Sequence, residues 1–225
     1  MKYIYHHLGL GDHIINNGMV RHFYKQYGQI TLFSYKHNVK NVQYMYRDLE
    51  KIQILGVESD AQADYYISNQ NLDCIKIGFS DLASVMPELP FDKAFYKLAG
   101  LDFSVRFDEF YFERDLQKER DVLDALNPTG ERYIFVHDDA SRGFSIDMDR
   151  VKTDHKIIMN DKKFNVFDYI LLIENAEEIH FMQSSFKELI CSYELKKPIL
   201  YQHNYVRKYD ECMNSSGINP IIEID

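Results

Sequence analysis

Short β-rich runs that alternate with amphipathic helical patterns are the feature that most constrains this fold. In the first half, the sequence predicts helices at 13–27 and 39–50 and strands at 2–8, 29–35, 51–57 and 73–79. Strands that alternate with helices form a mostly parallel sheet with helices on both faces. The first half therefore reads as an α/β unit.

The same pattern restarts after a turn signal, Asn127-Pro128-Thr129-Gly130, which follows a mostly helical region at 92–126. It predicts helices at 164–175 and 185–195 and strands at 132–137, 155–159, 178–182 and 198–202. We expect two Rossmann-like units, 1–118 and 119–225, with mostly parallel sheets that face each other across a cleft.

Charge and length narrow the possible partners and location. The 225 residues carry 26 basic and 35 acidic side chains, and acids exceed bases in both halves, which argues against nucleic acid as a partner. No apolar run approaches the roughly 20 residues of a membrane-spanning helix. The N-terminus does not resemble a signal peptide, and three scattered cysteines suit a reducing compartment. We expect a cytoplasmic protein without a transmembrane segment.

The first candidate site is Gly9-Leu10-Gly11-Asp12, directly after the first predicted strand. Ligands of open parallel sheets bind at the carboxyl ends of the strands. A dinucleotide fingerprint fails here, because Ile14 stands at the third glycine position and residues 35–38 offer no acid for a ribose. Asp12 would also repel a phosphate. The loop is therefore expected to present an acid to the cleft, or Asp12 caps the following helix.

The second candidate site is the loop from His137 to Gly143, after the first strand of the second unit. Arg142 lies in this loop, and the planar guanidinium of arginine binds phosphate in a bidentate manner. In the alternative interpretation, Arg142 belongs to a surface loop and pairs with a neighbouring acid.

The third candidate site is Gln183-Ser184-Ser185-Phe186, where a strand gives way to a helix. Ser185 and Glu188 match the capping box S-x-x-E. The free N–H groups and the dipole of such a helix start favour an anion. Capping accounts for Ser185, but it leaves Ser184 and Gln183 without a role.

His6, His7 and His13, together with Asp12, raise the question of a metal site. Adjacent strand residues point to opposite faces, so His6 and His7 are poorly placed to share an ion. We predict neither a metal ion nor a cofactor. An NAD-linked oxidoreductase and a non-catalytic nucleotide- or carbohydrate-binding module are two functions that these observations leave open.

These motifs and this layout resemble the two-domain GT-B glycosyltransferases, most nearly the lipopolysaccharide heptosyltransferase type and more loosely the fucosyltransferases of that fold. Leu10-Gly11-Asp12 matches the Leu-Gly-Asp of the heptosyltransferases, whose Asp is the proposed catalytic base. The segment 182–189 looks like the one that opens a helix against the donor phosphates, and 137–142 is similar to the donor-site loop. The chain is shorter than typical members and has Ser184-Ser185 where the heptosyltransferases usually have Thr-Gly.

The resemblance implies a metal-independent transferase of polysaccharide biosynthesis. Its donor would be a nucleotide sugar, and its acceptor a glycan or a lipid-linked hydroxyl compound. Asp12 would be the general base. The expected donor-binding residues are Gly11, His137, Arg142, Gln183, Ser184, Ser185 and Phe186.

Overall fold

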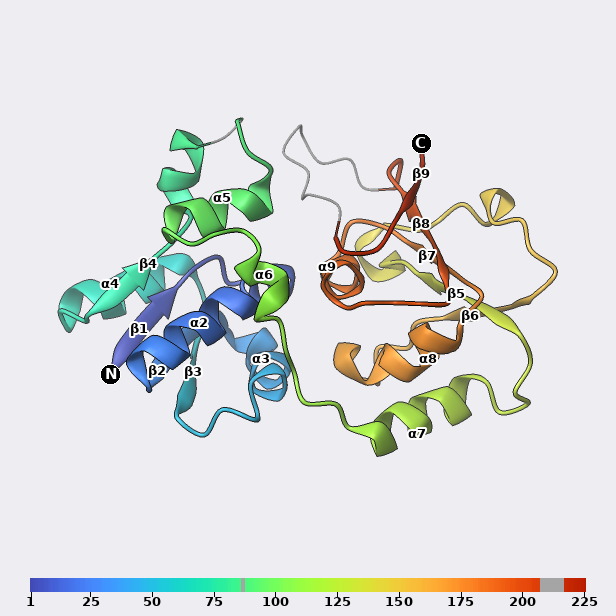
Figure 1. Cartoon of the computed structure of the whole chain (residues 1–225), viewed down its shortest axis with the longest axis horizontal. Coiled ribbons are helices and arrows are strands. Elements are labelled where there is room, and N and C mark those ends of the chain that lie inside the picture. The colour runs from blue at the N-terminus through green and yellow to red at the C-terminus, as the bar shows by residue number, and fades with distance from the viewer. Residues whose placement is uncertain (86–87, 207–216) are drawn as a thin grey trace. The chain divides into compact units, whose positions relative to one another are not determined.

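The computed structural model describes residues 1–85, 88–206 and 217–225, and it divides into two compact units (Figure 1). Unit 1 contains Met1–Glu113, and unit 2 begins at Arg114. The sequence-based boundary at residue 118 lies within helix α7 (Leu116–Leu126), which belongs to unit 2. Each unit is an α/β structure around one parallel sheet, as predicted.

The sheet of unit 1 has the strand order β3-β2-β1-β4, and its paired strands are parallel. The strands are β1 (Lys2–Tyr5), β2 (Ile30–Tyr35), β3 (Ile52–Val57) and β4 (Cys74–Lys76). Apolar side chains of the central strands, such as Ile4, Leu32 and Phe33, are fully buried in the core. The four predicted strands are confirmed, although β1 and β4 each end three residues earlier than expected.

The helices of unit 1 are short; α1 to α4 connect its successive strands, and α5 and α6 follow its last strand (Figure 1). They are α1 (Leu10–Ile15), α2 (Asn17–Tyr27), α3 (Val39–Met45), α4 (Asp60–Asn69), α5 (Phe91–Leu98) and α6 (Val105–Asp108), with 3-10 turns η1 (Lys36–Asn38) and η2 (Phe79–Ser84). The prediction of one helix at 13–27 was wrong. The helix begins earlier and breaks at Asn16, whose φ of −89° and ψ of 7° interrupt it.

The sheet of unit 2 has the order β6-β5-β7-β8-β9, also with parallel pairs. The strands are β5 (Tyr133–His137), β6 (Lys156–Met159), β7 (Glu178–Phe181), β8 (Ile199–His203) and β9 (Ile222–Ile224). The sequence did not predict β9, because three residues at an edge are too short for a periodic signal.

The helices of unit 2 include α7 and α8 (Ile170–Asn175), which lie side by side in Figure 1, and α9 (Ser185–Ser192). Short 3-10 turns are η3 (Ala140–Arg142), η4 (Met148–Arg150) and η5 (Val166–Tyr169). The region predicted as helical over 92–126 contains helices α5, α6 and α7 with non-helical segments between them. No helix in the described ranges is long and apolar enough to cross a membrane.

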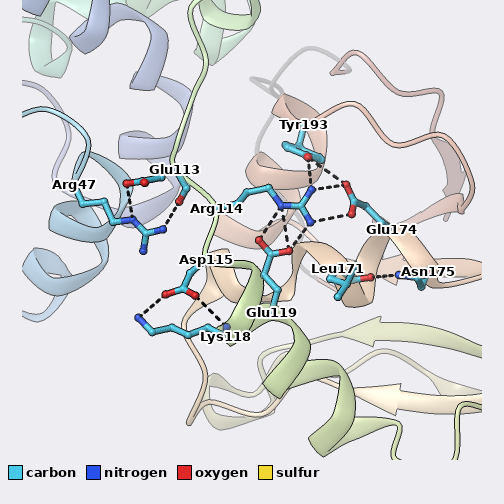
Figure 2. Close-up of polar contacts among 10 residues, drawn as sticks. All are labelled: Arg47, Glu113, Arg114, Asp115, Lys118, Glu119, Leu171, Glu174, Asn175 and Tyr193. Carbon is cyan, nitrogen blue, oxygen red and sulfur yellow. Dashed lines mark hydrogen bonds and ion pairs between the residues drawn. The ribbon is translucent and has the colours of Figure 1, made fainter.

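Two consecutive residues at the boundary are each held within their own unit (Figure 2). In unit 1, the guanidinium of Arg47 donates a hydrogen bond to the backbone oxygen of Glu113 over 2.8 Å. In unit 2, Arg114 donates to the carboxylates of Glu119 on α7 and Glu174 on α8. Arg114 therefore ties the start of unit 2 to two of its helices.

Candidate functional site

Asp12 lies in the first turn of α1, at the carboxyl end of β1. The residue that caps α1 is Gly9, so the interpretation of Asp12 as the N-cap residue is corrected. Its carboxylate folds back over Gly9, since a Cβ on Gly9 would lie only 2.6 Å from Asp12 Oδ2. A negative charge here is favoured by the helix dipole, and Asp12 is partly exposed. Gly11 lies beside it in the same turn.

Two polar residues near Asp12 were missed by the sequence-based reasoning. Tyr35 ends β2, and its hydroxyl donates a 2.9 Å hydrogen bond to Asp60 Oδ2 at the start of α4. Asn38 of η1 donates to the backbone oxygen of Leu8 over 3.2 Å, which ties the end of β2 to the loop before Asp12. The available signal was that Tyr35 ends the predicted strand 29–35 and that Asp60 follows the predicted strand 51–57 by three residues.

His6 and His13 are buried and His7 is partly exposed. The expectation that His6 and His7 are adjacent strand residues was wrong, because β1 ends at Tyr5. His6 packs against His13 with ring centroids 4.7 Å apart, whereas His7 accepts a hydrogen bond from the backbone N–H of Phe79. Burial lowers the pKa of His6 to about 4 and that of His13 well below the ordinary value, so both rings are neutral. Within the described residues, no group of three or more His, Cys, Asp or Glu side chains is placed to hold a metal ion.

In unit 2, the start of α9 differs from the prediction by one residue. Ser184, not Ser185, is the N-cap, and its hydroxyl accepts a hydrogen bond from the backbone N–H of Lys187 over 3.3 Å. The extended backbone of Ser184, with φ −164° and ψ 174°, is the conformation of a capping residue. Ser185 is therefore the first helical residue and is partly exposed, while Gln183 is buried.

His137 and Phe186 are brought together by the fold. Their rings stack with centroids 4.5 Å apart and an interplanar angle of 18°. Phe186 is buried and also contacts Phe135 and Tyr169, so it anchors α9 in the core. Burial lowers the pKa of His137 to about 4, and its Nδ1 atom is buried without a hydrogen-bond partner in the described chain.

Arg142 lies in a tight turn after β5. Asp139 and Phe144 form an isolated bridge across this turn, and Gly143 has a positive φ of 82°. The guanidinium of Arg142 is paired with Asp139, and more than half of its side chain is exposed. Asp139 also lies 3.4 Å from Lys162 Nζ. Arg142 therefore already has an acidic partner, which a phosphate ligand would have to displace or share.

The predicted site residues thus fall into two sets, one in each unit. Unit 1 holds Asp12 and Gly11 at the carboxyl edge of its sheet. Unit 2 holds the other predicted donor residues at the carboxyl ends of β5 and β7: His137, Arg142, Gln183, Ser184, Ser185 and Phe186. Both edges are positions where parallel α/β sheets bind ligands.

Comparison with sequence families finds no match, and comparison with curated proteins finds none either. Solved structures do match. A glycosyl transferase family 9 protein from Veillonella parvula DSM 2008 aligns with 99% of this chain and 86% of its own, at a TM-score of 0.59 and 8% identity. The E. coli ADP-heptose lps heptosyltransferase II aligns with 100% of this chain and 90% of its own, at a TM-score of 0.58 and 7% identity.

The match to the iron-containing dodecameric glycosyltransferase TibC from enterotoxigenic E. coli H10407 covers less of both chains. TibC aligns with 89% of this chain and 57% of its own, at a TM-score of 0.54 and 9% identity. These likenesses concern the fold. They confirm the predicted architecture of two parallel α/β units of the GT-B type and the predicted resemblance to heptosyltransferases.

Proposed function

We propose that this chain is a glycosyltransferase that moves a sugar from a nucleotide-sugar donor to a hydroxyl acceptor. The observation that carries the proposal is the placement of Asp12 within a fold shared over nearly the whole chain with glycosyltransferases. Its carboxylate stands at the carboxyl edge of the unit 1 sheet, where Gly9 makes room for it. The donor would bind at unit 2, and the acceptor at unit 1.

In the proposed reaction, Asp12 removes the proton from the acceptor hydroxyl as that oxygen attacks the anomeric carbon. The bond from the anomeric carbon to the diphosphate breaks, and its electron pair leaves with the nucleoside diphosphate. A positioned general base contributes about 10²–10⁴-fold to such a reaction. Positive charge that faces the leaving group stabilises the transition state.

The leaving diphosphate would be held by the first turn of α9 and by Arg142. Ser185 and the N–H groups of the helix start supply hydrogen-bond donors, and the helix dipole favours an anion. This arrangement holds the charge with protein groups alone, so the proposed mechanism needs no metal ion.

The test is a panel of nucleotide sugars, with release of nucleoside diphosphate measured in the presence of simple glycosides as acceptors. We expect release with at least one donor and a loss of at least 10²-fold in kcat for Asp12→Asn. Nucleotide binding should remain, because Asp12 lies in unit 1. Arg142→Ala and Ser185→Ala should instead weaken the binding of the nucleoside diphosphate.

Two results would contradict the proposal. Unchanged turnover in Asp12→Asn would remove Asp12 from the role of base. Nucleotide binding without turnover of any donor would favour the non-catalytic binding module instead.

A further inference from the structure

Asp60 is the centre of a hydrogen-bond network that includes Tyr35, a residue on which the charge of Asp12 also acts. It accepts two phenol O–H groups, that of Tyr5 on Oδ1 and that of Tyr35 on Oδ2, each over 2.9 Å. Burial first, and then the hydrogen bond to Asp60, raise the pKa of both phenols, so both are neutral donors. The proton of Tyr35 is thereby committed to Asp60, and its oxygen can only accept a further hydrogen bond.

The two tyrosines differ in their access to solvent. Tyr5 is fully buried, with its ring against Phe33 and Phe79. Tyr35 is partly exposed, and its ring stacks on the exposed ring of His37 with centroids 5.5 Å apart. Of this pair, Tyr35 is therefore the one that a bound molecule at the carboxyl edge can touch.

Tyr35 and Asp12 share this edge. Tyr35 ends β2, and Asp12 follows the neighbouring parallel strand β1. The hydrogen bond from Asn38 to Leu8 holds the two segments together. The carboxylate of Asp12 also contributes to the raised pKa of Tyr35, after burial and Asp60. A molecule positioned against Asp12 would therefore meet the exposed edge of Tyr35.

The side chains of this edge carry more negative than positive charge, although Lys40 of α3 is an exposed cation close to it in the sequence. Asp12 and Asp60 contribute carboxylates, whereas Lys36 is paired with Glu58 over 2.6 Å and Lys76 with Asp64 over 2.6 Å. Carboxylates repel phosphate and carboxylate groups but accept hydrogen bonds from hydroxyls. The groups at this edge therefore suit a ligand rich in O–H donors and without negative charge.

We propose that Tyr35, held in place by Asp60, binds the acceptor, and that the acceptor is an uncharged, hydroxyl-rich sugar and not a phosphorylated or acidic one. This inference rests on the proposed function, because that function places the acceptor at unit 1. It adds the chemical class of the acceptor and the residue that recognises it.

The test compares Tyr35→Phe with the matched control Tyr5→Phe, which removes the other phenol from the same carboxylate. The probes are methyl α-glucoside, methyl α-galactoside and methyl α-mannoside and the 6-phosphates of these glycosides, with binding measured by saturation-transfer NMR. We expect at least one neutral glycoside to bind at least tenfold tighter than its phosphate. Tyr35→Phe should weaken that binding about fivefold, as expected for one lost hydrogen bond, and Tyr5→Phe should change it less than twofold.

Several outcomes would overturn the inference: equal effects of the two variants, binding of none of the neutral glycosides, or preference for the phosphates. Lys40 is exposed on α3, so the phosphates are also tested against Lys40→Ala; tighter phosphate binding that this variant abolishes would replace Tyr35 by Lys40 as the recognition residue. Absence of nucleotide-sugar hydrolysis by the wild type would count against the proposed function, whereas a failed binding comparison counts against the acceptor class alone.

Discussion

At Gly9, the missing side chain decides where the carboxylate of Asp12 lies. The backbone of Gly9 is extended, with φ −67° and ψ 149°, so any residue could adopt it. The constraint is steric, because a Cβ would come within 2.6 Å of Asp12 Oδ2. Position 9 therefore needs a glycine because a larger residue would displace the carboxylate of Asp12, and not because the backbone makes a turn there.

Gly9→Ala should displace the carboxylate of Asp12 with little effect on folding. We expect transfer activity to fall about 10²-fold, since misplacement of a catalytic group by about 1 Å has effects of this size. The free energy of unfolding should change by less than about 1 kcal/mol. Steady-state kinetics and urea unfolding measure the two quantities.

The control for this prediction is a double-mutant cycle with Asp12→Ala. In that background, Gly9→Ala should cause no further loss of activity, because the displaced group is already gone. An additional loss of tenfold or more would show that Gly9 acts through something other than Asp12.

At the scale of the element, helix α9 depends on its cap and on its core contacts. Ser184 satisfies the N–H of Lys187, and Phe186 packs against aromatic residues of the unit 2 core. Ser185 follows the cap and has no such role in starting the helix. The two adjacent serines are therefore expected to differ in how much they stabilise the helix.

Ser184→Ala should lower the free energy of unfolding of unit 2 by about 1 kcal/mol, the usual effect of losing a side-chain cap. Ser185→Ala should change it by less than about 0.5 kcal/mol. Urea denaturation followed by circular dichroism measures both variants against the wild type. A larger loss of unfolding free energy for Ser185→Ala than for Ser184→Ala would instead support the predicted capping box of Ser185 and Glu188.

At the scale of the whole molecule, buried histidines are the main acid-sensitive groups near neutral pH. Burial lowers the pKa of six of them, and to about 4 for His6, His137 and His203. The other three are His7, His13 and His180. In the folded state, the pKa values of all six histidines lie below the ordinary value of about 6.5. The unfolded chain therefore binds more protons than the folded chain between pH 6.5 and 4.

Stability should therefore be greatest above about pH 6.5 and fall as the pH decreases toward 4. The three groups with a pKa of about 4 give a slope of about 3.6 kcal/mol per pH unit near pH 5. Urea denaturation at half-unit steps of pH measures this slope. His203→Gln should reduce the slope by about one third, because one of the three protons no longer binds. A flat profile between pH 6.5 and 4.5 would contradict the burial of these rings.

The sequence alone determined the α/β class of both units, most of the strands, and the positions of Asp12 and of the α9 start after strands. These features are local, because they depend on the spacing of apolar residues and on glycines and turns between elements. For the same reason, the sequence could place the candidate residues at strand ends without knowing the strand order.

Only the tertiary structure decided the break at Asn16, the choice of Ser184 over Ser185 as cap, the edge strand β9, and the contact between Tyr35 and Asp60. The last of these joins the end of β2 to the start of α4, and it forms because β2 and β3 are neighbours in the sheet. Strand order and register depend on the packing of the whole unit. No local pattern in the sequence encodes which strand ends will meet.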